Sequence, residues 1–228
     1  MQTRPDMLTE LCLAQRGFDF IAGFDEVGRG ALAGPVMVGV AVMKADDIAH
    51  AKVPSGLTDS KLLSERRREG LYDELLGWCA ASAVGQASNV EIDQWGISHA
   101  LGIAALRALA QVERRIGMDL VGARVGAILD GPNDYITKAL DSFDAPEVPV
   151  LAQIMTRIKA DQCCALVSAA SVIAKVTRDR LMVSLASGNV EYAPYHWERN
   201  KGYGSLEHRE AIRRLGPCEL HRVSWHLI

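Results

Sequence analysis

Apolar residues along the chain gather in short runs, and five of these runs have the length and β-branched content of strands. Glycine, proline or polar residues bound each run. A short loop separates the first two runs, which predicts an antiparallel pair, and the first three together resemble a meander. The predicted strands cover residues 18–24, 36–43, 80–88, 125–131 and 151–158.

Apolar positions that recur every three or four residues predict two long helices between these strands. The clearest period covers residues 97–116, and we interpret its apolar stripe as part of the core. The second long helix is predicted over residues 165–187. Its early residues, from Ser168 to Ser171, are all small, so another part of the protein could approach this helix closely.

Shorter helical patterns and irregular stretches fill the rest of the chain. An amphipathic helix is predicted at residues 7–15, and two more helices are predicted to follow the N-cap residues Ser64 and Ser205. Asn89 is predicted to begin a short turn. The stretches without a clear period, which we expect to be loop or weak helix, are residues 132–150 and 188–204.

The alternation of strands and helices predicts an α/β fold with a mixed central sheet flanked by helices. The chain has 228 residues, of which 49% are apolar, so it can bury a sizeable core. We therefore expect a single domain over residues 1–228. Residues 188–228 are expected to form a small helical C-terminal extension.

Charge and cysteine content exclude several classes of protein. The formal net charge is −3, so no global basic field indicates a nucleic-acid partner, although Lys and Arg cluster locally. The five cysteines contain no CxxC pair, which favours reduced thiols over a disulfide framework or a zinc site. Neither a signal peptide nor an apolar run of about 20 residues is found. We expect a cytoplasmic monomer without a membrane partner.

Acidic residues follow three of the apolar runs directly. Asp25 and Glu26 come after the first run, Asp130 ends the fourth, and Asp161 follows the fifth. Each acid taken alone is also compatible with a turn or cap. The same position at three strand ends favours a shared role, because neighbouring strands would bring the four carboxylates to one edge of the sheet. Three other acids are interpreted as ordinary turn or cap residues: Asp134, Asp141 and Asp144.

Carboxylates packed closely together repel one another and take up protons unless a cation neutralises them. Oxygen ligands without nearby His or Cys favour Mg²⁺ or Mn²⁺ over zinc. Two such ions about 4 Å apart can hold the attacking and leaving oxygens of a phosphodiester in line. The acids therefore predict metal-dependent phosphodiester hydrolysis.

The glycine-rich loop after the first acids has two interpretations. Gly28, Gly30 and Gly34 superficially resemble a dinucleotide-binding fingerprint, but that fingerprint leads into a helix, whereas this loop leads into a predicted strand. The other interpretation is that glycine lets a sugar or phosphate touch the main chain. Main-chain N–H and C=O groups can pair with a 2′-hydroxyl, which both donates and accepts.

Several blocks of this sequence closely resemble bacterial ribonuclease HII, and they occur in that family's order. They extend from about Phe20 to Trp225 and so cover nearly the whole chain. The blocks are FDEVGRGALAGPV, TDSKLLSERRR, ILDG, KADQCCALVSAASVIAKVTRDRLM, NKGYGSLEH and GPCELHRVSW.

The resemblance implies an RNase H-like fold and a set of four acids for catalysis and metal binding. Asp25 and Glu26 match the first two acids, Asp130 matches the third, and Asp161 matches the fourth. It implies two Mg²⁺ or Mn²⁺ ions, of which one would activate a water and the other would stabilise the leaving 3′-oxygen.

The resemblance also implies how the substrate is bound. Gly28, Arg29 and Gly30 match the loop that reads the ribose 2′-hydroxyl. Lys61 matches a phosphate-contacting lysine. Tyr203 matches the tyrosine that stacks against the next sugar and helps to select an RNA–DNA junction.

The reaction implied is cleavage on the 5′ side of a ribonucleotide, in RNA–DNA hybrids and in duplex DNA with embedded ribonucleotides. It leaves 3′-hydroxyl and 5′-phosphate ends and serves the removal of ribonucleotides from DNA. One departure from the family is Leu62, where a second lysine is usual. This departure concerns an auxiliary contact to the nucleic-acid backbone, not the chemistry.

Two other classes of protein stay open from the sequence. A non-catalytic module that binds RNA–DNA hybrids would need the basic clusters but not the acids. A Rossmann-type dehydrogenase would need a helix directly after Gly34.

Overall fold

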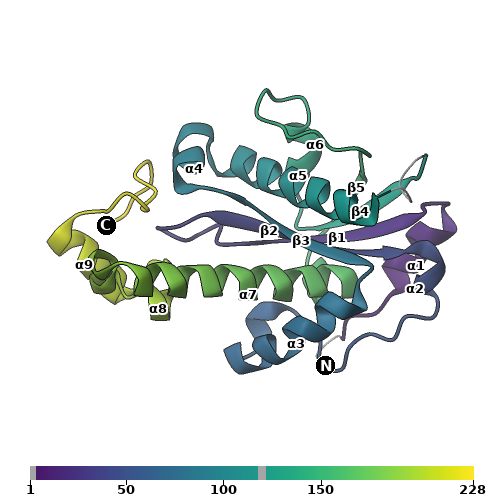
Figure 1. The fold of residues 1–228 in the computed structure, drawn as a ribbon, viewed down its shortest axis with the longest axis horizontal. Coiled ribbons are helices and arrows are strands. Elements are labelled where there is room, and N and C mark those ends of the chain that lie inside the picture. The colour runs from purple at the N-terminus through teal and green to yellow at the C-terminus, as the bar shows by residue number, and fades with distance from the viewer. Residues whose placement is uncertain (1–3, 118–121) are drawn as a thin grey trace.

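The computed structural model of the chain describes residues 4–117 and 122–228. In these ranges a mixed five-stranded sheet lies between two layers of helices (Figure 1). The strand order is β3-β2-β1-β4-β5, with β1–β2 and β2–β3 antiparallel and β1–β4 and β4–β5 parallel. The strands are β1 (Phe20–Val27), β2 (Val36–Lys44), β3 (Ala81–Ala87), β4 (Val125–Asp130) and β5 (Gln153–Arg157).

The predicted meander and mixed sheet are confirmed, but β1 is longer than its apolar run. Asp25 pairs with Gly39 and Glu26 pairs with Val38 in the ladder with β2. The first two acids therefore lie within the strand, because ladder hydrogen bonds use main-chain groups and continue past a polar side chain.

A helix layer covers each face of the sheet. α5 (Ile97–Ile116) packs on one face, and its predicted stripe lies in a core with alternate residues of the strands, such as Phe24. α7 (Ala165–Gly188) packs on the other face, with α3 (Glu65–Trp78) beyond it. Figure 1 shows both layers edge-on.

Two glycines of the sheet explain the small residues of α7. A Cβ on Gly23 would lie 2.4 Å from main-chain atoms of Leu166 and Val167, and a Cβ on Gly39 would lie 2.5 Å from the carbonyl oxygen of Ala170. Real Cβ contacts of this kind do not occur, so the helix axis can come this close only over glycine. The close neighbour predicted for α7 is therefore the sheet itself.

The turn predicted at Asn89 is wrong, since α4 (Asn89–Trp95) begins there. Ser88 and Glu91 form a capping box: Ser88 Oγ accepts from Glu91 N at 3.2 Å, and Glu91 Oε2 accepts from Ser88 N at 2.6 Å. This reciprocal pair satisfies two main-chain N–H groups and starts a helix where composition indicated a turn.

The other short helices agree with the sequence or refine it. α1 (Leu8–Gln15), α3 and α9 (Leu206–Leu215) are confirmed, with Ser64 and Ser205 as side-chain caps of the last two. The connection after β2 contains the one-turn helix α2 (Ala45–Ile48). α6 (Tyr135–Ala139) lies in the stretch predicted as loop or weak helix, capped by Asp134.

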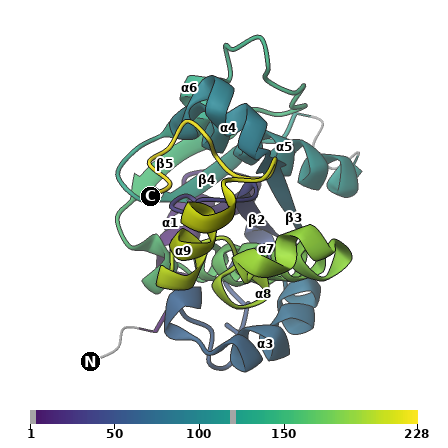
Figure 2. The ribbon, with the colours of Figure 1, turned by 90° about the vertical axis from the view of Figure 1, so that its left-hand side faces the viewer.

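The C-terminal residues wrap around the end of α7. The 3₁₀ segment η4 (Val190–Tyr195), α8 (Trp197–Asn200) and α9 enclose a small apolar cluster with Met182 of α7 and the buried Trp197. Figure 2 shows α8 and α9 in front of α7. The stretch without a period is thus built from short helical turns.

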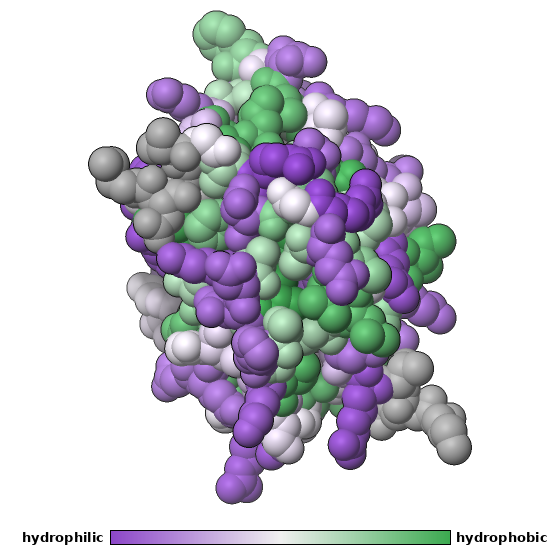
Figure 3. All heavy atoms as spheres, turned by 90° about the vertical axis from the view of Figure 1, so that its right-hand side faces the viewer, coloured by the Kyte–Doolittle hydropathy of each residue, from purple (hydrophilic) through white to green (hydrophobic). Residues whose placement is uncertain are grey.

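Figure 3 shows the face on the right of Figure 1, where hydrophilic residues surround small groups of apolar ones. None of the helices in the described parts of the chain combines the length and apolarity needed to cross a bilayer.

Candidate active site

Asp25 is buried at the centre of the candidate site. It lies two residues after Gly23 in β1 and therefore on the sheet face that α7 covers. Its side chain is only 3% exposed. Burial raises the pKa of Asp25 well above its usual range, a hydrogen bond from Ser171 opposes that rise, and the charge of Asp130 adds to it.

Asp130 ends β4, the parallel neighbour of β1. Phe24 pairs with Leu129, so Asp130, the next residue along β4, lies at the level of Asp25. Its Oδ1 accepts a hydrogen bond of 2.7 Å from the main-chain N–H of Ala160. This contact ties the end of β4 to the turn that carries the next acid.

Asp161 lies in η3 (Ala160–Gln162), a 3₁₀ turn beyond β5, rather than at the strand end itself. Burial raises the pKa of Asp161 to about 6, with further contributions from the charges of Asp130 and Asp59, while Lys61 opposes them. Lys61 Nζ lies 4.0 Å from Asp161 Oδ2, and its own side chain is 70% exposed. The lysine thus borders the buried acids and also faces solvent.

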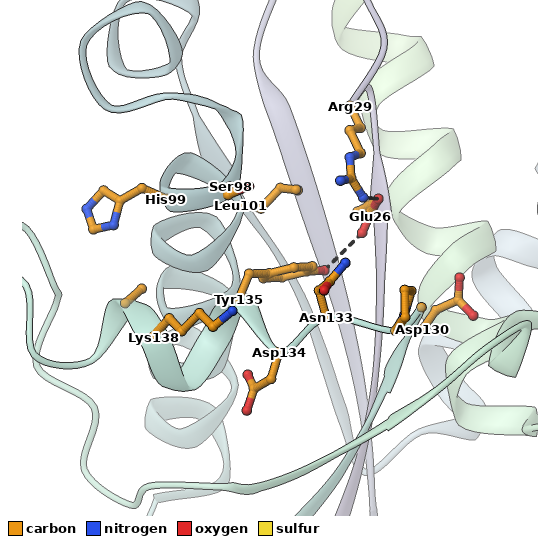
Figure 4. Close-up of a pocket in the computed structure, with 13 residues that line it drawn as sticks. Glu26, Arg29, Ser98, His99, Leu101, Asp130, Asn133, Asp134, Tyr135 and Lys138 are labelled. Atoms are coloured by element: carbon orange, nitrogen blue, oxygen red, sulfur yellow. Dashed lines mark hydrogen bonds and ion pairs between the residues drawn. The ribbon is translucent and has the colours of Figure 1, made fainter.

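Glu26 follows Asp25 in the strand and has different partners. Its Oε2 accepts a hydrogen bond of 3.2 Å from the Tyr135 hydroxyl, and its Oε1 pairs with Arg29 at 3.0 Å (Figure 4). Burial raises the pKa of the Tyr135 hydroxyl well above its usual range, and Glu26 adds to this rise, so the hydroxyl stays protonated and donates. Tyr135 is a site neighbour that the sequence analysis missed.

A pocket of about 480 Å³ opens beside Glu26. Figure 4 shows Tyr135 and Lys138 of α6 on one side of it and Asp130 with the loop after β4 on another. Side chains of both signs border it, among them Arg29 and Lys138. Glu26 and Asp130 both line this pocket, so it joins two of the predicted acids.

The structure brings Asp25, Asp130 and Asp161 into one electrostatic group, while Glu26 is held by Tyr135 and Arg29. In the described ranges no three His, Cys, Asp or Glu side chains are arranged to hold a metal ion as they stand. The donor chemistry nevertheless fits a hard divalent cation. Burial and mutual repulsion disfavour the ionised form of clustered carboxylates, and a bound cation would favour that form instead.

Asp59 is a further buried acid near this group. Its Oδ1 accepts from the main-chain N–H of Lys61 at 2.9 Å, and its Oδ2 accepts from Gln162 at 3.4 Å. It caps η1 (Ser60–Leu62) and adds to the raised pKa of Asp161. The sequence signal was an Asp two residues before Lys61, typical of a cap. No local signal identifies Tyr135, whose role depends on α6 packing against α5 so that the hydroxyl reaches Glu26.

The glycine loop meets Tyr203 of the C-terminal segment. Gly28 has φ +80° and donates its main-chain N–H to the Tyr203 hydroxyl at 3.1 Å. A Cβ on Gly28 would lie 2.2 Å from Arg178 Nε, whereas a Cβ on Gly30 would meet no atom of the described residues within 4 Å. The loop leads into the strand β2 and not into a helix, which excludes the dinucleotide-binding alternative.

The Tyr203 ring rests against two cations of α7. Arg178 Cζ lies 5.4 Å and Lys175 Nζ lies 5.7 Å from the ring centroid. An isolated bridge pairs Ala31 with Tyr203 along the main chain. Loop and tyrosine are thus one structural unit, although they lie far apart in the sequence.

A model of the family "Ribonuclease HII" matches residues 22–228 of this chain. The chain belongs to this family. A ribonuclease HII of Streptomyces griseus is 44% identical over 212 residues, which are 93% of this chain and 79% of that protein. Residues 22–228 contain every candidate residue named above.

Solved structures show the same fold. The ribonuclease H2 of Pyrococcus horikoshii OT3 has a TM-score of 0.68 and 26% identity, with 91% of this chain and 94% of that chain covered. A Bst-RNase HIII determined in complex with Mn²⁺ also has a TM-score of 0.68, at 22% identity, with 94% of this chain and 70% of that chain covered. The predicted RNase H-like fold is confirmed. As a member of this family, the protein is an endonucleolytic hydrolase with ribonuclease H activity.

Proposed function

We propose that this enzyme hydrolyses the phosphodiester on the 5′ side of a ribonucleotide, in RNA–DNA hybrids and in duplex DNA with embedded ribonucleotides. The products would carry 3′-hydroxyl and 5′-phosphate ends, and the reaction would serve ribonucleotide removal. The observation that carries the proposal is the hydrogen bond between Gly28 and Tyr203. Gly28 lies two residues after Glu26 in the chain. It joins a main-chain surface suited to a ribose hydroxyl to the buried acids.

Asp25, Glu26, Asp130 and Asp161 would hold the divalent ions, for which we propose Mg²⁺ or Mn²⁺. The all-oxygen donor set supports this choice, as does the Mn²⁺ bound to the Bst-RNase HIII of the same fold. When bound, such ions supply an activated water and charge stabilisation at the phosphate. The chain contributes a cluster of acidic side chains near the ends of β1 and β4, in which Asp25 and Asp161 are buried.

Cations at the border of the site would position the phosphate. Lys61 is exposed on one side, beside Asp161, and Arg29 is exposed on the other, beside Glu26. Both can bind phosphate oxygens without being buried, and Lys175 adds charge below the Tyr203 ring. Specificity for base sequence is not expected, since these groups would contact the sugar and phosphate only.

The ribose would be read by the main chain of the glycine loop. Arg29 and Gly30 are exposed, and in the described residues their N–H groups have no acceptor. A 2′-hydroxyl can accept from such a group and donate to a neighbouring carbonyl. The Tyr203 ring would stack on the adjacent sugar, which makes residues 188–228 a substrate-contacting part of a single domain.

The experiment is a nicking assay on two matched duplexes, one of DNA alone and one with a single ribonucleotide. Incubation with Mg²⁺ should cut only the second duplex, once, on the 5′ side of the ribonucleotide, and omission of divalent ions should abolish cutting. End-labelling of the products identifies the 3′-hydroxyl and 5′-phosphate. Binding without cutting would favour the hybrid-binding module, and cutting of both duplexes would contradict the proposed specificity.

We further propose that the enzyme acts in the cytoplasm, in keeping with its free cysteines, and that it acts as a monomer.

A further inference from the structure

Arg222 is a fully buried cation beneath the glycine loop. Its side chain belongs to the C-terminal segment and is 0% exposed. It donates to the carbonyl oxygens of Gly28 at 2.7 Å, Arg29 at 3.0 Å and Gly34 at 3.1 Å. All three acceptors lie in residues 28–35, the segment that connects β1 to β2.

Arg178 of α7 is a second buried cation that holds the same segment from another side. It is also 0% exposed and donates to Ala33 at 3.1 Å and Pro35 at 2.9 Å. Its remaining bond, of 2.9 Å, goes to the carbonyl oxygen of Lys201, two residues before Tyr203. Arg178 therefore joins the glycine loop to the turn that carries the tyrosine.

Neither guanidinium pairs with a carboxylate in the described residues. Asp179, next to Arg178 in the chain, pairs with Lys175 and Arg68 instead. Burial and the nearby charge of Arg178 lower the pKa of Arg222 to about 9, so it stays protonated at neutral pH. Burying two cations without a carboxylate partner is costly. Here carbonyl dipoles offset the cost, together with the aromatic rings of Tyr203 beside Arg178 and Trp225 beside Arg222.

The planar fork of arginine suits this arrangement, because several carbonyls in fixed directions can be bound by one side chain. A lysine offers a compact charge without the fork. The arginines hold the carbonyl groups of the loop on its buried side. The N–H groups of the exposed residues Arg29 and Gly30 have no acceptors in the described ranges.

We propose that Arg222 and Arg178 are positioning residues, which fix the shape of residues 28–35 so that the enzyme distinguishes a ribonucleotide from a deoxyribonucleotide. Neither side chain touches the substrate; both act through the loop main chain and Tyr203. This inference rests on the proposed function, since it concerns how that function obtains its specificity.

The test measures the affinity of Arg222→Lys and Arg178→Lys for the two matched duplexes by fluorescence anisotropy in EDTA, where no turnover occurs. Wild type should bind the ribonucleotide duplex more tightly. Each variant should lose about tenfold of that preference, the equivalent of one charge-assisted hydrogen bond, while its affinity for all-DNA duplex stays within about twofold. The control is Arg124→Lys, since Arg124 also donates to a carbonyl, that of Gly17, but away from the loop.

The outcomes distinguish the positioning role of the two arginines from the proposed function. Circular dichroism and thermal unfolding establish which variants are folded, and the two arginines provide independent variants if one fails to fold. A folded variant that keeps the wild-type preference, or that loses affinity for both duplexes equally, overturns the positioning role alone. A wild type that binds both duplexes equally and nicks neither overturns the proposed function together with this inference.

Discussion

The Tyr203 hydroxyl accepts a hydrogen bond of 3.1 Å from the main-chain N–H of Gly28, a residue 175 positions earlier in the chain. This contact joins the loop beside the first acids to the C-terminal segment. Because Gly28 lies two residues after Glu26, any shift of the tyrosine reaches the candidate active site through a short piece of main chain. The substrate-reading and hydrolytic parts are therefore expected to respond together to changes at Tyr203.

Tyr203→Ala should reduce cleavage of a single embedded ribonucleotide by about 10–100-fold, since stacking on an aromatic ring contributes roughly 1–3 kcal/mol. Affinity for the duplex should fall by only about threefold, because the basic groups remain. Tyr203→Phe is the matched control: it keeps the ring and loses only the acceptor for Gly28, so a loss of about 2–10-fold is expected. Cleavage rates and anisotropy measure both quantities. Equal losses of cleavage and affinity in Tyr203→Ala would mean that the ring serves docking alone.

Asp25→Asn and Asp130→Asn should each reduce cleavage in Mg²⁺ by about 10²–10³-fold or more, while duplex binding persists. Asp25→Asn should also raise the melting temperature at pH 8, by about 2–4 °C for each kcal/mol recovered, because it removes a buried charge that its neighbours repel. The control is Asp141→Asn, at an exposed position, which should change neither property. Near-normal turnover by either site variant would remove Asp25 and Asp130 from the proposed ion-binding set.

Duplex binding should weaken as salt concentration rises, because phosphate contacts release counterions. Lys61→Ala should reduce the slope of log K against log salt by about one unit, as expected for the loss of a single phosphate contact. Titrations at several salt concentrations measure this slope. Lys52→Ala, which changes an exposed lysine in the connection after α2, should leave it unchanged. A flat salt response of the wild type would contradict the basic border of the site.

Glu10 should make stability depend on pH. Its side chain is buried, its Oε1 accepts from Leu166 N at 2.9 Å, and its Oε2 has no hydrogen-bond partner among the described residues. Burial raises the pKa of Glu10 to about 7, with the charge of Asp6 adding to the rise and that of Arg157 opposing it. The folded protein therefore keeps a proton that the unfolded chain loses, so the contribution of Glu10 to stability is present at low pH and is lost as pH rises through about 4.5–7.

Glu10→Gln removes this titration and keeps the acceptor for Leu166. The variant should be more stable than wild type by on the order of 1–3 kcal/mol at pH 8 and about equal to it at pH 4. Urea unfolding at both pH values measures the difference. Glu147→Gln, at an exposed position, should show no such dependence. A difference that does not change with pH would show that the pKa of Glu10 is the same in the folded and unfolded states.

The sequence predicted most of the regular structure because periodicity and caps are local. The period over residues 97–116 gave α5 with the observed bounds, and Ser64 and Ser205 gave the starts of α3 and α9. The turn expected at Asn89 was wrong because the reciprocal bonds of Ser88 and Glu91 outweighed the composition of the stretch. The acids were found from their place after apolar runs, and their positions on β1, on β4 and in η3 agree with neighbouring strands.

By itself the sequence determined the α/β class, the family and the residue types available for the chemistry, because these follow from local pattern and motif. Tertiary structure decided which groups meet. It placed Asp25 under α7 through Gly23 and Gly39, it held Glu26 against Tyr135, and it buried Arg178 and Arg222 beneath the glycine loop. Such contacts join residues more than a hundred positions apart, and their energies depend on desolvation, which is set only when the chain has folded around them.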